Sequence, residues 1–402
     1  MKRKKTGRIC MIVCLAVIVL CNVYAWESKG FSDFYITYVF PIWVGTYGRF
    51  TGMFPFSVGE WLIVAGACLF LLAVILIPVR VILSILGKRN PEAGKLYSWK
   101  RRIAGYHYGF AWLVVVVAMI MTLNCFMLYH GTTFQETYFP GEQDEYSLEE
   151  LADAWNVVAV NCIRLSGMVE RDERGRVVYP GSVNAAGESV DVADKAREVM
   201  AQMGEEYPRL KGYYPRAKAM FFSDLMCQMY MAGYYFPFSM EANYNDVMQV
   251  TNTPSTICHE LAHLRGYILE DEANFISFLA CTRSDDIFFQ YSGYLEVMSY
   301  LYQELNNLTP EEVKYMNDAG IGICPITKQI LGDATFVLPE QWDRIEEEAV
   351  LDTETVEKAS DVFVETSLQL NGVSDGMKSY SRVVELLILY YRQHPEVPDF
   401  PD

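Results

Sequence analysis

The motif His259-Glu260-Leu-Ala-His263 is the part of this sequence with the clearest chemistry. Two histidines four positions apart lie on the same face of a helix, so both imidazoles can bind one Zn²⁺. Glu260 can then act as a general base on the water at the metal. The chain has only five histidines, and about 0.005 chance matches to HExxH are expected in it. The motif therefore predicts a zinc site, and the alternative is two surface histidines on an ordinary helix.

A catalytic zinc needs a third protein ligand and one open position. Gly266 is placed to end the first helix in a left-handed conformation, so a second helix is expected from about position 269 onward. That position is leucine, so the third histidine of the metzincin pattern is absent. The second helix instead begins with three candidate carboxylates, Glu270, Asp271 and Glu272.

Residues 253–284 resemble the gluzincin class of zinc peptidases, in which a helix after HExxH carries a glutamate ligand. Several branches of that class have the pattern Glu-x-x-Ala-Asp/Asn, and Glu270-Asp-Glu-Ala-Asn274 matches it. The resemblance implies that Glu270 is the third ligand and that Asn274 supports a zinc-bound histidine. Only six residues separate His263 from Glu270, fewer than in many gluzincins, so Glu272 stays open as the alternative ligand.

Several other residues are weaker candidates for a role in the site. Glu241 and Asn243 come just before a possible edge strand within 243–250, which could bind an extended peptide by strand addition; a turn is the simpler interpretation. Cys258 is expected to be buried beside the metal helix. Four tyrosines are candidates for stabilising an oxyanion, although most of the 27 tyrosines must serve packing: Tyr291, Tyr294, Tyr300 and Tyr380.

Three uncharged apolar runs precede this region, at residues 9–26, 61–79 and 110–129. Each is long enough to cross a hydrocarbon core of about 30 Å. Basic residues precede the first run and fill the segment 80–102, so the positive-inside rule predicts that both are cytoplasmic. The loop 27–59 and everything after about residue 130 are then expected outside. A cleaved signal peptide is the alternative for the first run, and a retained span is preferred.

The charge follows the same division of the chain. The net charge of −17 is the sum of +10 for residues 1–130 and −27 for residues 131–402. This division predicts a membrane module over 1–130 and an extracytoplasmic zinc-peptidase-like domain over 131–402. Nucleic-acid binding is disfavoured, because phosphates would be repelled by the acidic domain. The outer domain is expected to be mainly helical, with helices over 146–166, 190–203, 340–370 and 379–392.

Further segments extend the resemblance over most of the chain: PFSVGE, GYYFPFSMEANYND, HELAHLRG, EDEANF and SYSRVVELL. Together they resemble an uncharacterised bacterial family, a domain-of-unknown-function family of three-span membrane proteins with a zinc-peptidase core. The resemblance implies three transmembrane helices in the bacterial cytoplasmic membrane, followed by a mainly α (α+β) zincin-like domain.

These observations predict a membrane-anchored zinc metallopeptidase. His259, His263 and Glu270 would hold Zn²⁺, and Glu260 would take a proton from water as it attacks a peptide carbonyl. Its partners would be a peptide or protein substrate and the lipid bilayer, with the site in water above the membrane. The alternative function is a non-catalytic zinc-binding sensor or scaffold on the same fold. A transporter is disfavoured, because no span carries an internal charge.

Overall fold

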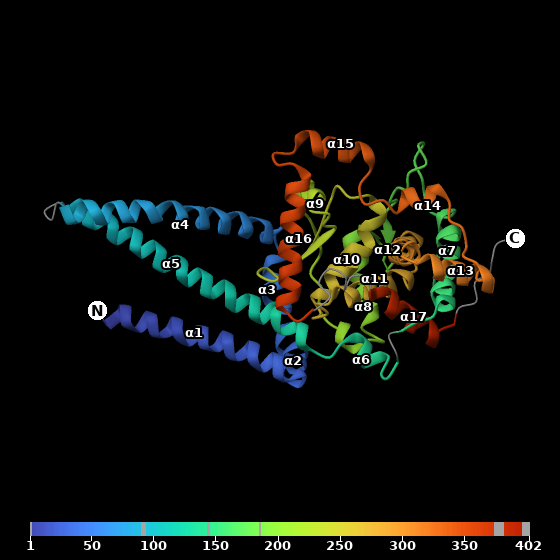
Figure 1. Ribbon diagram of the computed structural model, residues 1–402, viewed down its shortest axis with the longest axis horizontal. Coiled ribbons are helices and arrows are strands. Elements are labelled where there is room, and N and C mark those ends of the chain that lie inside the picture. The colour runs from blue at the N-terminus through green and yellow to red at the C-terminus, as the bar shows by residue number, and fades with distance from the viewer. Residues whose placement is uncertain (1, 90–93, 143–144, 185, 374–381, 396–402) are drawn as a thin grey trace.

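Three long helices form one end of the molecule, and a globular helical part forms the other (Figure 1). The computed structural model describes residues 2–89, 94–142, 145–184, 186–373 and 382–395. The long helices are α1 (Lys2–Glu27), α4 (Val58–Arg89) and α5 (Gly94–Asn124). Each contains a segment that is long and apolar enough to cross a membrane, namely Thr6–Glu27, Val58–Lys88 and Gly94–His130. Three candidate spans support the expected membrane protein.

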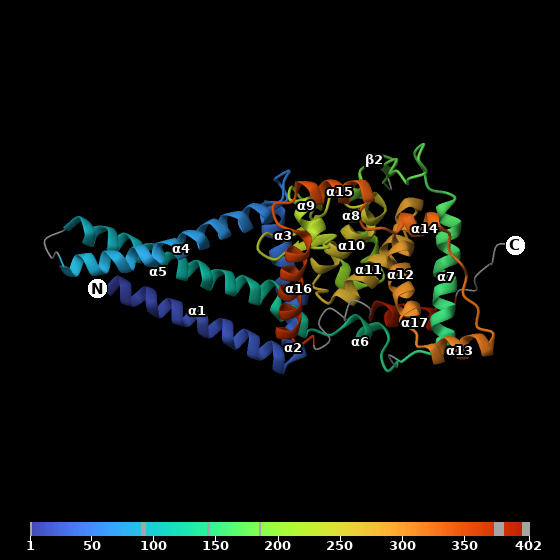
Figure 2. The same ribbon diagram turned by 45° about the horizontal axis from the view of Figure 1, so that its top comes forward.

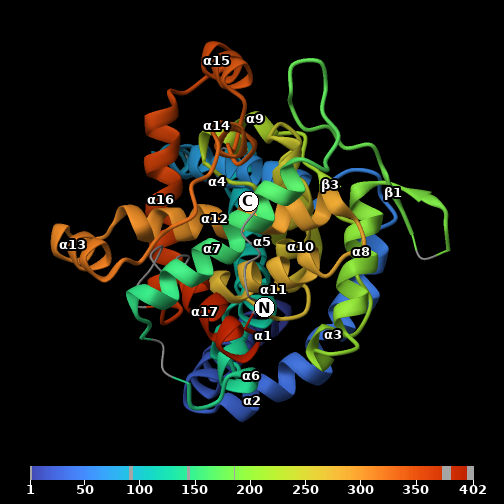
Figure 3. The same cartoon turned by 90° about the vertical axis from the view of Figure 1, so that its right-hand side faces the viewer.

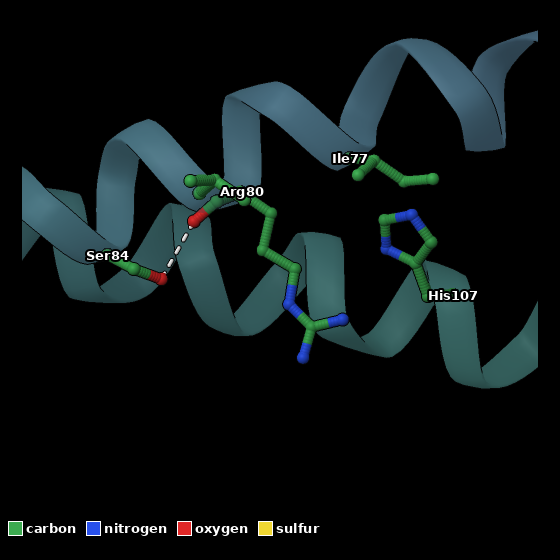
Figure 4. Close-up of a pocket in the computed structure, with 5 residues that line it drawn as sticks. Ile77, Arg80, Ser84 and His107 are labelled. Carbon is green, nitrogen blue, oxygen red and sulfur yellow. Dashed lines mark hydrogen bonds between the residues drawn. The ribbon is translucent and has the colours of Figure 1, made fainter.

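The helices α4 and α5 are longer than the apolar runs in the sequence. The basic segment between the runs continues both helices, since lysine, arginine and leucine are good helix formers, and the two pack along each other (Figure 1). Between them, the His107 ring lies with Nε2 3.1 Å from the Ala73 carbonyl and Nδ1 2.9 Å from the Ile103 carbonyl, and in its neutral form it donates to one of the two. His107 is thus a packing residue beside a small cavity. The cavity is lined by Ile77, Arg80, Val81, Ser84 and His107 (Figure 4).

The expected outer loop at 27–59 is mostly helical. It contains α2 (Lys29–Phe34), the π-helical turn η1 (Tyr35–Val39) and α3 (Phe40–Thr51). This continuous strip runs across the direction of the three long helices (Figure 2). Tyr35, Ile36, Phe40 and Val44 belong to the same core as the globular part. That core therefore includes residues from the first 130 positions.

The globular part is mainly helical, as expected. The helix over 146–166 appears as α7, and its capping box is present: the Ser147 hydroxyl accepts from the Glu150 amide, and the Glu150 carboxylate accepts from the Ser147 amide. The segment 340–370, expected to be helical, forms two helices, α15 (Pro339–Glu348) and α16 (Thr353–Leu370). The described helices are η2 (Phe126–His130), α6 (Phe134–Tyr138), α7 (Leu148–Ser166), α8 (Val192–Met203), η3 (Pro208–Leu210), α9 (Ser223–Gln228), η4 (Val250–Asn252), α10 (Thr253–His263), α11 (Glu270–Thr282), α12 (Ile287–Asn306), α13 (Pro310–Ala319), α14 (Lys328–Asp333), α15 (Pro339–Glu348), α16 (Thr353–Leu370) and α17 (Val383–Gln393).

A small sheet lies beside α10. Its strand order is β3 (Lys218–Ala219), β5 (Glu241–Tyr244), β4 (Gly233–Phe236), with β3 parallel and β4 antiparallel to β5. The possible edge strand within 243–250 is not formed, because β5 is the middle strand and ends at Tyr244, and the preferred interpretation of a turn fits the residues that follow. The Asn245 side chain ends β5, since Oδ1 accepts from the Val247 amide at 2.9 Å and forms a local turn. A separate hairpin pairs β1 (Ser182–Val183) with β2 (Ser189–Val190).

Glu241 joins this sheet to α4, the second candidate span, and its strand is paired on both sides, so it offers no free edge to a peptide. Its carboxylate accepts from the amides of Val58 and Gly59, the latter at 2.8 Å, at the amino end of α4. These amides have no partner within the helix, so the carboxylate satisfies them. The buried Lys218 ammonium pairs with the same carboxylate and also donates to the carbonyl of Thr51 at 2.8 Å. This cluster locks the strip, the sheet and α4 together.

Candidate metal centre

The motif helix α10 runs through the middle of the globular part and packs against α8, α11, α12 and the sheet (Figure 1). Pro254 lies in its first turn, where a missing amide costs nothing. Gly266 follows its end with φ at +85°, as its position in the sequence predicted. A side chain at Gly266 would also collide with Ile36 of the strip, since a Cβ would lie 2.9 Å from Ile36 Cγ2. The chain then enters α11 at Glu270.

This turn brings three potential metal ligands together. Glu270 Oε2 lies 3.0 Å from His259 Nε2 and 3.7 Å from His263 Nε2. One ligand atom from each of the three residues lies within 4.8 Å of the other two. Among the residues that the structure describes, this is the only group of three or more His, Cys, Asp or Glu with such geometry. Two imidazoles and one carboxylate form a donor set that suits Zn²⁺ with an open fourth position.

The protonation of His263 follows from its hydrogen bond. His263 Nδ1 lies 2.7 Å from the Tyr267 carbonyl, which can only accept, so Nδ1 carries the proton and Nε2 keeps its lone pair. Burial lowers the pKa of His263 to about 4, which keeps the ring neutral. Burial also lowers the pKa of His259, but the hydrogen bond with Glu270 and the nearby carboxylates outweigh it and raise that pKa to about 9.

Glu260 lies on the same helix, buried and against β4. A Cβ on Gly233 would lie 2.5 Å from Glu260 Oε1, so only glycine lets the strand approach this carboxylate. Burial raises the pKa of Glu260 to about 8, while the adjacent His259 lowers it. Its Oε2 atom is buried without a hydrogen-bond partner. A buried carboxylate oxygen without a hydrogen-bond partner costs free energy. Such an oxygen is more typical of a functional group than of a packing residue.

The structure brings Glu270 to the histidines, and it places Glu272 elsewhere. Two positions along a helix correspond to a rotation of about 200°, so the two side chains leave α11 on opposite faces. The Glu272 carboxylate is buried and accepts a hydrogen bond from the Phe134 amide at the start of α6. Burial raises the pKa of Glu272 to about 8. Its position indicates a link between α11 and α6.

Asn274 lies one turn after Glu270, but its side chain bonds to a tyrosine rather than to a histidine. Asn274 Nδ2 donates to the Tyr300 hydroxyl at 2.9 Å. Glu270 in turn raises the pKa of that hydroxyl, after the larger effect of burial. Tyr300 is therefore connected to the cluster through Asn274 and Glu270.

The other three tyrosines have different surroundings. Tyr291 donates to Asp333 Oδ2 at 2.7 Å, and Tyr294 packs its ring edge against Phe278. Tyr380 lies outside the described residues. Cys258 is completely buried, as expected.

Three residues near the cluster were missed in the sequence. Glu296, on α12, interacts electrostatically with His259 and accepts from the Ser277 hydroxyl at 2.6 Å. A lone carboxylate on an otherwise apolar helix face was the available signal for it. Tyr129, near the carboxyl end of the third candidate span, interacts with Glu270, and Tyr234 of β4 interacts with Glu260. Neither tyrosine stands out among 27 in the sequence.

Comparisons with known proteins give one match. The model of the family described as "Protein of unknown function (DUF3810)" matches residues 35–388, which include the second and third spans and the whole candidate centre. No curated protein and no solved structure matches the chain.

Proposed function

We propose that this chain, which belongs to the DUF3810 family of proteins of unknown function, is a membrane-anchored zinc metallopeptidase. Its catalytic part would be a zincin-like domain over residues 131–402. The observation that carries the proposal is the convergence of His259, His263 and Glu270 beside the buried, unpartnered carboxylate oxygen of Glu260. A binding site for zinc alone has no use for that fourth group.

The residues present fit a zinc ion. His263 presents the lone pair of Nε2 because its Nδ1 proton is held by the Tyr267 carbonyl, and the two histidines lie one helical turn apart. Glu270 supplies a carboxylate oxygen to the same point. Zinc bound there would supply a Lewis acid that polarises a peptide carbonyl and activates water. His259, His263 and Glu270 would be its three protein ligands.

The proton transfers fall to Glu260. It would accept a proton from the water that attacks the peptide carbonyl and then deliver that proton to the leaving amine. Its other oxygen is held near β4, where Gly233 packs against it and the Tyr235 amide bonds to the carboxylate. This contact keeps the carboxylate in one orientation. Tyr300 is the preferred candidate to donate a hydrogen bond to the oxyanion.

The proposed placement of the domain follows from charge. The tip of the α4–α5 hairpin includes Arg80, Lys88, Arg101 and Arg102, and loops rich in lysine and arginine remain in the cytoplasm. The amino terminus, MKRKKTGR, would lie on the same side. The globular part, which carries the excess of acidic residues, would then lie outside the cytoplasmic membrane of a bacterium.

Peptide cleavage by the full-length protein tests the proposal. The purified wild-type chain and the variants Glu260→Gln and Glu347→Gln would be incubated with a peptide library and the products read by mass spectrometry. We expect cleavage by the wild type and by Glu347→Gln, which changes an exposed glutamate, and none by Glu260→Gln. Equal cleavage by Glu260→Gln would contradict the assigned base. A wild type that binds zinc but cleaves nothing would favour a sensor or scaffold.

A further inference from the structure

The strip α2–η1–α3 has two faces of different character. One face packs into the core through Tyr35, Ile36, Phe40 and Val44, each at most 6% exposed. The opposite face, which we call the outer face, consists of Phe34, Tyr38, Ile42 and Phe50, which are 57–65% exposed. Large apolar side chains so exposed to water are unfavourable in a continuous patch, and such a patch marks an interaction surface.

The outer face carries no free charge. The strip has three charged side chains, and each is directed to the protein. Lys29 pairs with Glu136 of α6, and Asp33 accepts from the Thr132 amide at 2.7 Å and from its hydroxyl. The guanidinium of Arg49 lies 3.9 Å from the centre of the Tyr213 ring. What remains outward is uncharged: aromatic and aliphatic side chains, with the hydroxyls of Thr37 and Thr46 among them.

The apolar surface continues from the strip to the start of the second span. Phe50, Phe54 and Phe56 contact one another in sequence, edge-on and then tilted, along the chain that leads into α4. Beside them, Trp61 at the start of the span contacts the exposed rings of Phe221 and Phe222. Aromatic residues of this kind are enriched where membrane proteins meet the lipid headgroups.

The strip runs across the direction of the three long helices. Seen along the axis of the long helices, α2 and α3 appear lengthwise, so they run across that axis (Figure 3). The same arrangement is visible from the side (Figure 2). With about 1.5 Å per residue, the strip from Lys29 to Thr51 is about 35 Å long. If the spans cross a bilayer, the strip lies in the plane of its surface.

We propose that the outer face of the strip is embedded in the headgroup region of the bilayer, on the side of the globular part. An uncharged aromatic face, opposite a face packed on protein, fits the boundary between headgroups and acyl chains. The surface is continuous with the membrane spans, which favours lipid over a second protein as its occupant. This proposal does not depend on a bound metal.

The strip also contacts the turn beside the candidate centre. The inner face of the strip touches the turn that ends the motif helix, because Ile36 packs directly on Gly266. The carbonyl that orients His263 belongs to the next residue, Tyr267. If the strip lies on lipid, this turn is held one helix layer from the membrane surface. A substrate peptide that is itself anchored in the membrane could then reach the candidate centre with a segment close to its anchor.

Photo-crosslinking in nanodiscs of phosphatidylethanolamine and phosphatidylglycerol tests the proposal on the full chain. Benzoylphenylalanine would replace Tyr38 in one variant, Tyr315 in a second, and Leu72 of α4 in a third. Tyr38 and Tyr315 are matched exposed tyrosines, and Tyr315 lies on α13, far from the spans (Figure 1). Adducts would be identified by mass spectrometry after proteolysis.

We expect phospholipid adducts in the variants with the probe at position 38 or 72, and none in the variant with the probe at position 315. The proposal is overturned if Leu72 gives lipid adducts and Tyr38 gives none. It is also overturned if Tyr38 crosslinks mainly to a second protein chain, because the outer face would then be a protein interface. Since Tyr38 is exposed and touches no candidate ligand, failure of the metal centre would not affect this result.

Discussion

The substitution Lys218→Met removes the cation from the cluster that joins the sheet to α4. Lys218 is almost fully buried, and its ammonium is bonded to the Glu241 carboxylate, to the Thr51 carbonyl at 2.8 Å and to the Phe56 carbonyl at 3.0 Å. Methionine fills a similar volume but satisfies none of these acceptors. The change therefore isolates the electrostatic role of the residue from its packing.

The expected loss is large for a single substitution. Removing one partner of a buried ion pair costs about 3–5 kcal/mol, because the other charge remains buried. The buried Thr51 carbonyl and the partly buried Phe56 carbonyl also lose a donor, at up to about 1 kcal/mol each. The amides of Val58 and Gly59 still bond to Glu241 and reduce the total. We expect a loss of about 5 kcal/mol. For a chain of 402 residues this corresponds to an apparent melting temperature lower by about 6 °C.

Thermal unfolding of the detergent-purified protein, followed by intrinsic fluorescence at a fixed scan rate, measures this effect. Lys358→Met is the matched control, because Lys358 pairs with Glu354 on the exposed face of α16 and such pairs contribute about 0–1 kcal/mol. The double variant Lys218→Met/Glu241→Gln should recover part of the loss, since it removes the unpaired charge but keeps an acceptor. Equal shifts for the two single variants would refute the role assigned to the cluster.

Two further predictions concern the candidate centre. Gly233→Ala would place a Cβ about 1 Å too close to the Glu260 carboxylate. A displacement of that size should reduce peptide cleavage by about 10²-fold and leave the zinc content unchanged. The control Gly332→Ala, whose new Cβ would lie in open space, should change neither cleavage nor zinc content. Glu272→Gln should retain zinc, because the Glu272 carboxylate bonds to α6 and not to the centre, whereas Glu270→Gln should lose zinc. Zinc analysis of the two purified variants tests this prediction. The reverse pattern would make Glu272 the ligand.

Features that depend on neighbours in the sequence were predictable. The three spans follow from uninterrupted apolar runs, and the start of α7 follows from the capping box at Ser147 and Glu150. The approach of His259, His263 and Glu270 follows from helical spacing and from a glycine that lets the chain turn at position 266. In each case the interacting groups are separated by a few turns of helix at most.

Features that depend on distant pairing were not predictable. Glu241 was considered for peptide binding, but it lies in a middle strand and holds the amino end of a helix about 180 residues earlier in the chain. The segment 27–59 was expected to be a loop because it lies between two apolar runs. Its helices are stabilised by packing of Tyr35, Ile36, Phe40 and Val44 against the distant globular core, which no local pattern shows. Glu296 and Tyr129 reach the centre from separate helices, and no local pattern connects them to it.

The zinc content of the purified full-length protein tests the central claim most directly. Inductively coupled plasma mass spectrometry would be applied to the wild type, to Glu260→Gln and to His263→Ala after dialysis against metal-free buffer. We expect one zinc per chain in the wild type and in Glu260→Gln, because Glu260 is the proposed base and not a ligand. We expect His263→Ala to lose zinc. A folded wild-type protein that has been supplied with zinc and retains none would contradict it.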